Sequence, residues 1–261
     1  MEWLAFLLAI IMGFTLGLLG GGGSILTLPI LTYVMAVEPV TATAYSLFVV
    51  GATAVVGTWR KAREKMVAWR EGLTFALPSL VAVFLTRYWL VPALPEVLWQ
   101  TSAFKLTKDV AVMIFFALVM LAAAYSMIRP GKPSPKNGAK ASYLWIIIDG
   151  LVVGLITGLV GAGGGFLIVP ALVLLVRLPI KMAVGTSLMI IALKSLIGFS
   201  GDLLSGMAID WALLLPFTGF SILGLFIGSY ATRFIAAAPL KRLFGWFVLL
   251  MALLILYLEF S

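Results

Sequence analysis

Two glycine clusters interrupt apolar stretches of this 261-residue chain. The first is Gly20-Gly21-Gly22-Gly23-Ser24, and the second, Gly161-Ala162-Gly163-Gly164-Gly165, follows 141 residues later. Glycine is a poor helix former, and it lets another group approach the backbone closely. Each cluster therefore predicts a broken helix, whose next segment starts with unpaired N–H groups at the positive end of a helix dipole. Two such ends brought together would bind a small oxyanion.

The candidate ligands lie at the breaks and in the apolar segment that follows each of them. Backbone contacts are expected from Gly22, Gly23, Ser24, Gly163, Gly164 and Gly165. Side-chain contacts are expected from two pairs seven residues apart, a spacing that puts both members on one helix face. These are Ser46 and Thr53 in the first half, and Ser187 and Lys194 in the second, with Thr186 beside them.

Each of these residues also has an ordinary structural interpretation. The glycines could serve close helix packing, and the hydroxyls could bond to carbonyls of their own helices. Lys194 could extend to the membrane surface, although a cation inside an apolar segment is costly and points to function. Asp149, six residues into an apolar segment, could carry a coupling proton or reach the cytoplasmic interface.

The composition is that of an all-α integral membrane protein. The chain is 63% hydrophobic and 11% charged, whereas soluble domains are about 45–50% apolar and about 25% charged. It contains no cysteine and no histidine, which excludes thiolate metal sites, haem ligation by histidine and Ser–His catalysis. We expect no cofactor and no enzyme activity. The net charge of +8 lies in short loops, where it indicates membrane topology rather than nucleic-acid binding.

The sequence around the two clusters is an internal repeat. Between residues 17–29 and 158–170, seven of thirteen positions are identical, including Pro29 and Pro170. The apolar stretches 24–37 and 166–177 are too short to cross a bilayer, so each should be a short or re-entrant helix. The chain then consists of an N-terminal repeat (1–128), a basic linker (129–142) and a C-terminal repeat (143–261), each repeat with about five membrane helices and the chain with 8–10 membrane segments.

The distribution of lysine and arginine favours inverted repeats. With opposite orientations of the two halves, 14 of the 18 basic residues fall on the cytoplasmic side, and with equal orientations only 9 do. The linker is then cytoplasmic and both termini are outside.

The glycine motifs Gly-Leu-Leu-Gly-Gly-Gly-Gly-Ser (17–24) and Gly-Leu-Val-Gly-Ala-Gly-Gly-Gly (158–165) resemble the paired signature of the TauE/SafE family, the sulfite exporter or toluene sulfonate uptake permeases. The stretch 183–188 resembles the segment that follows the motif in that family. The resemblance covers essentially the whole chain. It implies a membrane transporter for sulfite, sulfoacetate or other sulfonates. Lys194 departs from this pattern.

The leading hypothesis is thus a secondary transporter of a small organosulfur anion in the cell (inner) membrane, driven by a proton or sodium gradient. Its partners are the anionic substrate and the lipid bilayer, not nucleic acid. An anion channel is the first alternative, because the same helix ends could line a continuous pore. A membrane-embedded enzyme and a non-transporting assembly partner are two others.

Overall fold

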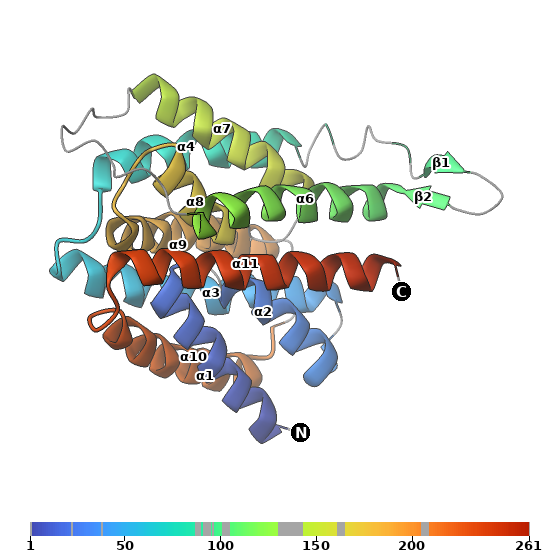
Figure 1. The fold of residues 1–261 in the computed structure, drawn as a ribbon. Helices are drawn as coiled ribbons and strands as arrows, with labels where there is room; N and C mark the ends of the chain where they lie inside the picture. The colour runs from blue at the N-terminus through green and yellow to red at the C-terminus, as the bar shows by residue number, and fades with distance from the viewer. Residues whose placement is uncertain are drawn as a thin grey trace.

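The chain folds into a bundle of apolar helices (Figure 1). The computed structural model describes all residues except 1, 22, 38, 87–89, 91–94, 96, 101–104, 130–142, 161–164, 205–208 and 261. The first half contains α1 (Glu2–Leu19), α2 (Gly23–Pro29), the π-helical turn η1 (Ile30–Val34), α3 (Pro39–Arg63), α4 (Trp69–Leu85) and α6 (Lys108–Ile128). The second half contains α7 (Tyr143–Val160), α8 (Gly165–Leu174), α9 (Ile180–Leu204), α10 (Trp211–Ala231) and α11 (Ala237–Phe260).

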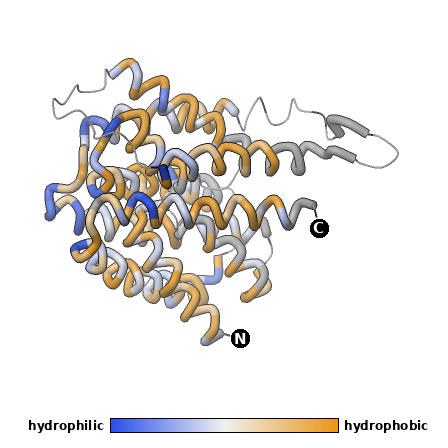
Figure 2. The backbone as a smooth tube through the Cα atoms, viewed as in Figure 1, coloured by the Kyte–Doolittle hydropathy of each residue, from blue (hydrophilic) through white to orange (hydrophobic). Residues whose placement is uncertain are grey.

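Three helices in the described part of the chain are long and apolar enough to cross a membrane on their own. They cover Thr41–Arg63, Ile180–Ser200 and Trp211–Ala231, and shorter apolar helices cover Trp3–Leu19, Ala117–Ile128 and Tyr143–Thr157. Large apolar side chains remain exposed on their outer faces, as expected for contact with lipid. Figure 2 shows apolar residues along most of the helices and hydrophilic ones gathered where α3 turns into α4. The prediction of an all-α integral membrane protein is therefore confirmed at this level.

The helices pack as pairs that join the two halves of the chain. In Figure 1, the pair α4–α7 lies on one side of the bundle and the pair α1–α10 on the other. The helices α3 and α9 pack along each other, and so do α6 and α11. Each of these four pairs takes one helix from residues 1–128 and one from residues 143–261, so the halves are intertwined.

A short antiparallel hairpin precedes α6. Its strands β1 (Val97–Gln100) and β2 (Lys105–Thr107) pair in register Gln100 with Lys105, and β2 leads directly into α6. The hairpin extends beyond the bundle on the side where the C-terminus lies (Figure 1).

Glycines set the close approach of the outer helix pairs. In the α1–α10 pair, a Cβ on Gly13 would overlap the carbonyl oxygen of Ser221, and one on Gly224 would overlap that of Ile10. In the α4–α7 pair, a Cβ on Gly154 would lie 2.5 Å from the carbonyl oxygen of Ser79. Helices in membranes associate through such small residues, because apolar burial alone gives them no advantage over lipid.

We predict that Gly224→Ala loosens the α1–α10 pair. Overpacking of a tight contact costs about 1–3 kcal/mol, which corresponds to a melting temperature lower by roughly 2–10 °C. Gly219 is the matched control, because a Cβ at this position of the same helix meets nothing within 4 Å. Thermal unfolding of both variants in detergent tests this, and equal melting temperatures would contradict the packing role of Gly224.

Candidate functional site

The first glycine cluster ends α1 and turns the chain back along it. Gly20 has φ +79°, a left-handed conformation that closes the helix, and its N–H donates to the carbonyl of Leu16 at 2.8 Å. The helix α2 then begins at Gly23, where a Cβ would lie 2.8 Å from the Cβ of Leu16. The break is thus a tight turn between two packed helix segments, and both glycines are needed for its geometry.

The helix starts that follow the two breaks lie next to each other. A Cβ on Gly165, the first residue of α8, would lie 2.8 Å from Oγ of Ser24, the second residue of α2. The Ser24 hydroxyl donates to the carbonyl of Gly21 at 2.8 Å, which holds it at the turn of the first break. Segments 141 residues apart in the sequence therefore meet at their helix starts.

One face of α9 contacts Gly20 in the first break and Gly165 at the start of α8. A Cβ on Gly20 would lie 2.6 Å from Oγ of Ser187, and one on Gly165 would lie 2.9 Å from Cδ1 of Ile191. Lys194 follows on the same face, since positions 187, 191 and 194 are spaced by helical turns. We call Val184, Ser187, Ile191 and Lys194 the α9 stripe.

Lys194 contacts the helix that precedes the second break. Its Nζ donates to Oγ1 of Thr157 in α7 at 3.3 Å, and Thr157 Oγ1 in turn donates to the carbonyl of Gly154 at 3.1 Å. Thr157 is 5% exposed and Lys194 is half-buried. The ammonium therefore lies inside the bundle, in contact with a buried hydroxyl.

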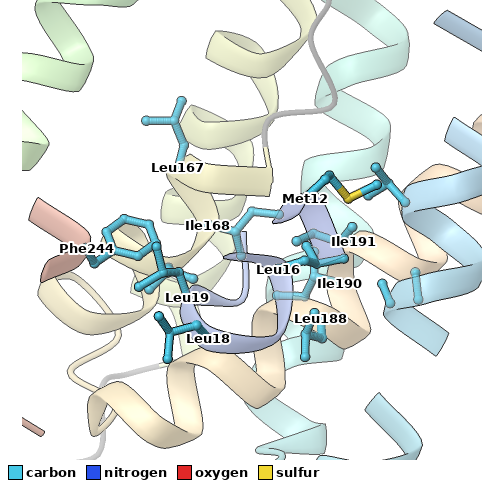
Figure 3. Close-up of a cluster of buried hydrophobic side chains, with 14 of the residues drawn as sticks. Met12, Leu16, Leu18, Leu19, Leu167, Ile168, Leu188, Ile190, Ile191 and Phe244 are labelled. Atoms are coloured by element: carbon cyan, nitrogen blue, oxygen red, sulfur yellow. The ribbon is translucent and has the colours of Figure 1, made fainter. Parts of the chain in front are cut away.

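Buried apolar side chains pack next to Gly23 and Gly165, among them Leu16 and Ile191. Figure 3 shows this cluster, with side chains from four helices: Met12, Leu16, Leu18 and Leu19 of α1, Leu167 and Ile168 of α8, Leu188, Ile190 and Ile191 of α9, and Phe244 of α11. In such low-polarity surroundings a single ammonium and a helix start interact more strongly with an anion than they would in water.

The other predicted ligands have different environments. Thr186 is buried, and its Oγ1 accepts the backbone N–H of Ala68 at 2.9 Å, which fixes the start of α4. Ser187 is buried and donates to the carbonyl of Val184 at 2.8 Å. Ser46 is half-buried, and Thr53 is fully buried with no hydrogen-bond partner for its Oγ1 in the described part of the chain.

Three predicted glycines and the linker lie outside the described residues. They are Gly22, Gly163, Gly164 and, apart from Arg129, the segment 129–142. Asp149 is half-buried in α7, eight residues before Thr157. All of these remain predictions.

Sequence reasoning missed Thr157 and Ile191. Thr157 occupies the position of Leu16 in the repeat. A polar residue in place of an apolar one, in the last turns before a break, was the sequence feature that could have identified it. Ile191 had no signal, because an isoleucine in an apolar helix is the expected residue.

The intertwined apolar bundle with paired helix breaks defines a multi-pass membrane protein. The model of the sulfite exporter TauE/SafE family matches residues 5–255, and the chain therefore belongs to this family of membrane transporters. This confirms the resemblance seen in the glycine motifs.

Several curated relatives support the assignment. A probable membrane transporter protein of Xylella fastidiosa (strain 9a5c) is 32% identical over 254 residues, which cover 95% of this chain and 92% of the relative. The probable membrane transporter protein YunE of Bacillus subtilis is 27% identical over 237 residues, 80% of this chain and 81% of the relative. No solved structure matches the chain significantly. The relatives' names indicate transport, and they favour neither a channel nor an enzyme.

The contact between the two breaks predicts coupling between Ser24 and Gly165. Gly165→Ala should lower the melting temperature because its Cβ meets Oγ of Ser24, and Ser24→Gly should recover part of the loss. In a double-mutant cycle, we expect a coupling of about 0.5 kcal/mol or more.

Ser200→Gly provides the matched control for this cycle. Its Oγ donates to the carbonyl three residues earlier at 2.8 Å, as Ser24 does, but it is exposed in α9. A coupling for Ser200 as large as that for Ser24, or none for Ser24, would contradict the proximity of the breaks.

Proposed function

We propose that this protein is a secondary transporter of small organosulfur anions such as sulfite, sulfoacetate or other sulfonates, and that the two breaks and the α9 stripe bind the substrate. The family name supports the substrate class. The contact of one helix face with both breaks, through Ser187 and Ile191, is the observation on which the proposal depends.

The chemistry of these groups suits a monoanion with several oxygens. Lys194 supplies one positive charge, and the start of α8 supplies unpaired N–H groups. The hydroxyls of Ser24, Ser187 and Thr157 each donate to a backbone carbonyl of their own segment. A hydroxyl hydrogen can rotate, so each could donate to a bound oxyanion instead.

Residues on α3 would complete the site from the first half. Thr53 occupies the position of Lys194 in the repeat, and Ser46 occupies that of Ser187. The buried Thr53 hydroxyl has no hydrogen-bond partner among the described residues, and it is the kind of group that a ligand or water normally satisfies. Gly22, Gly163 and Gly164 would add backbone contacts, and Asp149 in α7 is the proposed carrier of a coupling proton.

Equivalent contacts in the two halves support a two-fold relation between them. Gly13 packs on the carbonyl of Ser221 and Gly154 on that of Ser79, so each half supplies the glycine once and the serine once. The four interlocked helix pairs show the same exchange of the two halves. The pair α1–α10 corresponds to the pair α7–α4, and each of the pairs α3–α9 and α6–α11 corresponds to itself with the halves exchanged.

Two hydrogen bonds, one near the start of α3 and one near the start of α9, show the same exchange between the two halves. Ala68 N–H donates to Thr186 Oγ1 at 2.9 Å, and Asp210 N–H donates to the Tyr45 hydroxyl oxygen at 2.6 Å. Tyr45 and Thr186 are equivalent in the repeat, and each accepts from the residue before the next helix of the other half. Oppositely oriented halves would let the transporter alternate between two openings, related by a pseudo-two-fold axis, on the two sides of the cell (inner) membrane.

Ligand binding tests the role of Lys194. In a thermal-shift panel of sulfite, sulfoacetate, isethionate, taurine, sulfate and phosphate, sulfite or a sulfonate should stabilise the purified protein most. Lys194→Met keeps the apolar stem and removes the charge, so we expect the affinity to fall by about 10- to 100-fold, the value of a charged hydrogen bond.

Lys181→Met is the control, because Lys181 is a lysine in the first turn of the same helix. Unchanged affinity in Lys194→Met would move Lys194 out of the site. Failure of every sulfur anion, with stabilisation by another anion, would contradict the substrate class and leave the site itself in place.

A further inference from the structure

Three arginines stack on aromatic rings where the ends of α3 and α10 meet. Arg63 lies over the ring of Trp59 with its Cζ 4.0 Å from the centroid, and Arg60 lies over Phe226 at 5.3 Å. Arg233, just after α10, lies 6.0 Å from the centroid of Tyr230. A guanidinium stacked on a ring keeps its N–H edge available for oxyanions.

The two helix ends are joined by direct bonds, so the arginines form one cluster. Arg60 Nη1 donates to the carbonyl of Phe226 at 3.2 Å. Lys61, which is 3% exposed, donates from Nζ to Oγ1 of Thr232 and to Oε2 of Glu64, both at 3.1 Å. Arg233 Nη2 binds the other carboxylate oxygen of Glu64 at 2.8 Å.

This cluster has more positive charge than its carboxylate can neutralise. Burial alone would raise the pKa of Glu64, but the hydrogen bonds from Arg233 and Lys61 outweigh burial and hold its pKa below the ordinary value. Glu64 is therefore ionised at neutral pH, and it pairs with Lys61, Arg233 and, at 3.9 Å, Arg60. With Arg63, the cluster has four cations and one carboxylate, so a net positive charge remains.

An exposed apolar surface continues from the cluster along both helices. On α3, Val55 and Trp59 are exposed and precede Arg63 at intervals of four residues, which is one helix face. On α10, the exposed side chains are Leu223, Phe226, Ile227 and Tyr230. Both helices are membrane-span candidates whose windows end near this cluster, at Arg63 and Ala231.

We propose that the seam between α3 and α10 is a binding site for one anionic phospholipid. The phosphate would bind Arg60, Arg63 and the outer N–H groups of Arg233, and the acyl chains would lie on the exposed apolar side chains of the two helices. Guanidinium groups bind phosphate in a bidentate manner, and basic residues beside membrane helices attract anionic lipids. The adjoining apolar surface favours a lipid over a soluble phosphate. The proposal does not depend on the transported substrate.

Native mass spectrometry of the full chain tests this site. The protein would be released from nanodiscs that contain equal amounts of phosphatidylglycerol and phosphatidylcholine. We expect one retained phosphatidylglycerol with a preference of about tenfold, lost in the variant Arg60→Gln/Arg63→Gln, because each basic residue near the surface contributes several-fold to anionic-lipid binding.

Two further measurements keep the test decisive. Arg63→Gln alone changes an exposed side chain stacked on Trp59, so it should fold normally and reduce the preference by about threefold to fivefold. Arg129→Gln, which removes an exposed arginine stacked on Tyr125, should leave the preference unchanged. Equal retention of the two lipids by the native chain, full preference in Arg60→Gln/Arg63→Gln, or displacement of the lipid by millimolar inorganic phosphate would overturn the proposal.

Discussion

Backbone N–H and C=O groups inside a bilayer have no water to bond, so a helix that ends there must be covered by protein. This constraint explains the centre of the fold. The first break closes α1 with the left-handed Gly20, and its reversed segment packs on α1 at Gly23, where a side chain would collide with Leu16. The starts of α2 and α8 then meet at Ser24 and Gly165, and α9 contacts Gly20 and Gly165. The polar backbone groups of these helix ends and the apolar side chains packed on them thus lie together at the centre of the fold.

The intertwined helix pairs meet the same requirement, the coverage of backbone groups by protein, on the scale of the whole bundle. Gly20 meets Val184 and Ser187 of the second half, and Gly165 meets Ser24 of the first. The helices α3 and α9 pack along each other between the outer pairs α1–α10 and α4–α7. Glycines such as Gly13 and Gly224 bring the outer pairs to backbone contact. Lys194 introduces a positive charge into α9, whereas the matching position of the sequence repeat in α3 is Thr53. A single cation among hydroxyls and helix starts would select for anions of low charge.

Local patterns in the sequence predicted much of this structure. The glycine clusters, Pro29 and Pro170 predicted the short helices, and the spacing of Ser187 and Lys194 predicted a shared face, which in the structure runs along the breaks. The family resemblance rested on the same residues. Contacts between distant segments could not be predicted in this way. The Lys194–Thr157 contact, the bond from Ala68 to Thr186 and the Lys61–Glu64–Arg233 network all depend on which helices pack together, and no local periodicity encodes that choice.

Disulfide cross-linking between the two breaks tests the central claim most directly. The chain contains no cysteine, so a Ser24→Cys/Gly165→Cys variant would have a single possible intramolecular bond. A Cβ on Gly165 would lie 2.8 Å from Ser24 Oγ, which is close enough for disulfide geometry. After mild oxidation and proteolysis within the linker 129–142, the account predicts that the two halves stay joined until a reductant is added. Halves that separate without a reductant, in a folded variant, would contradict it.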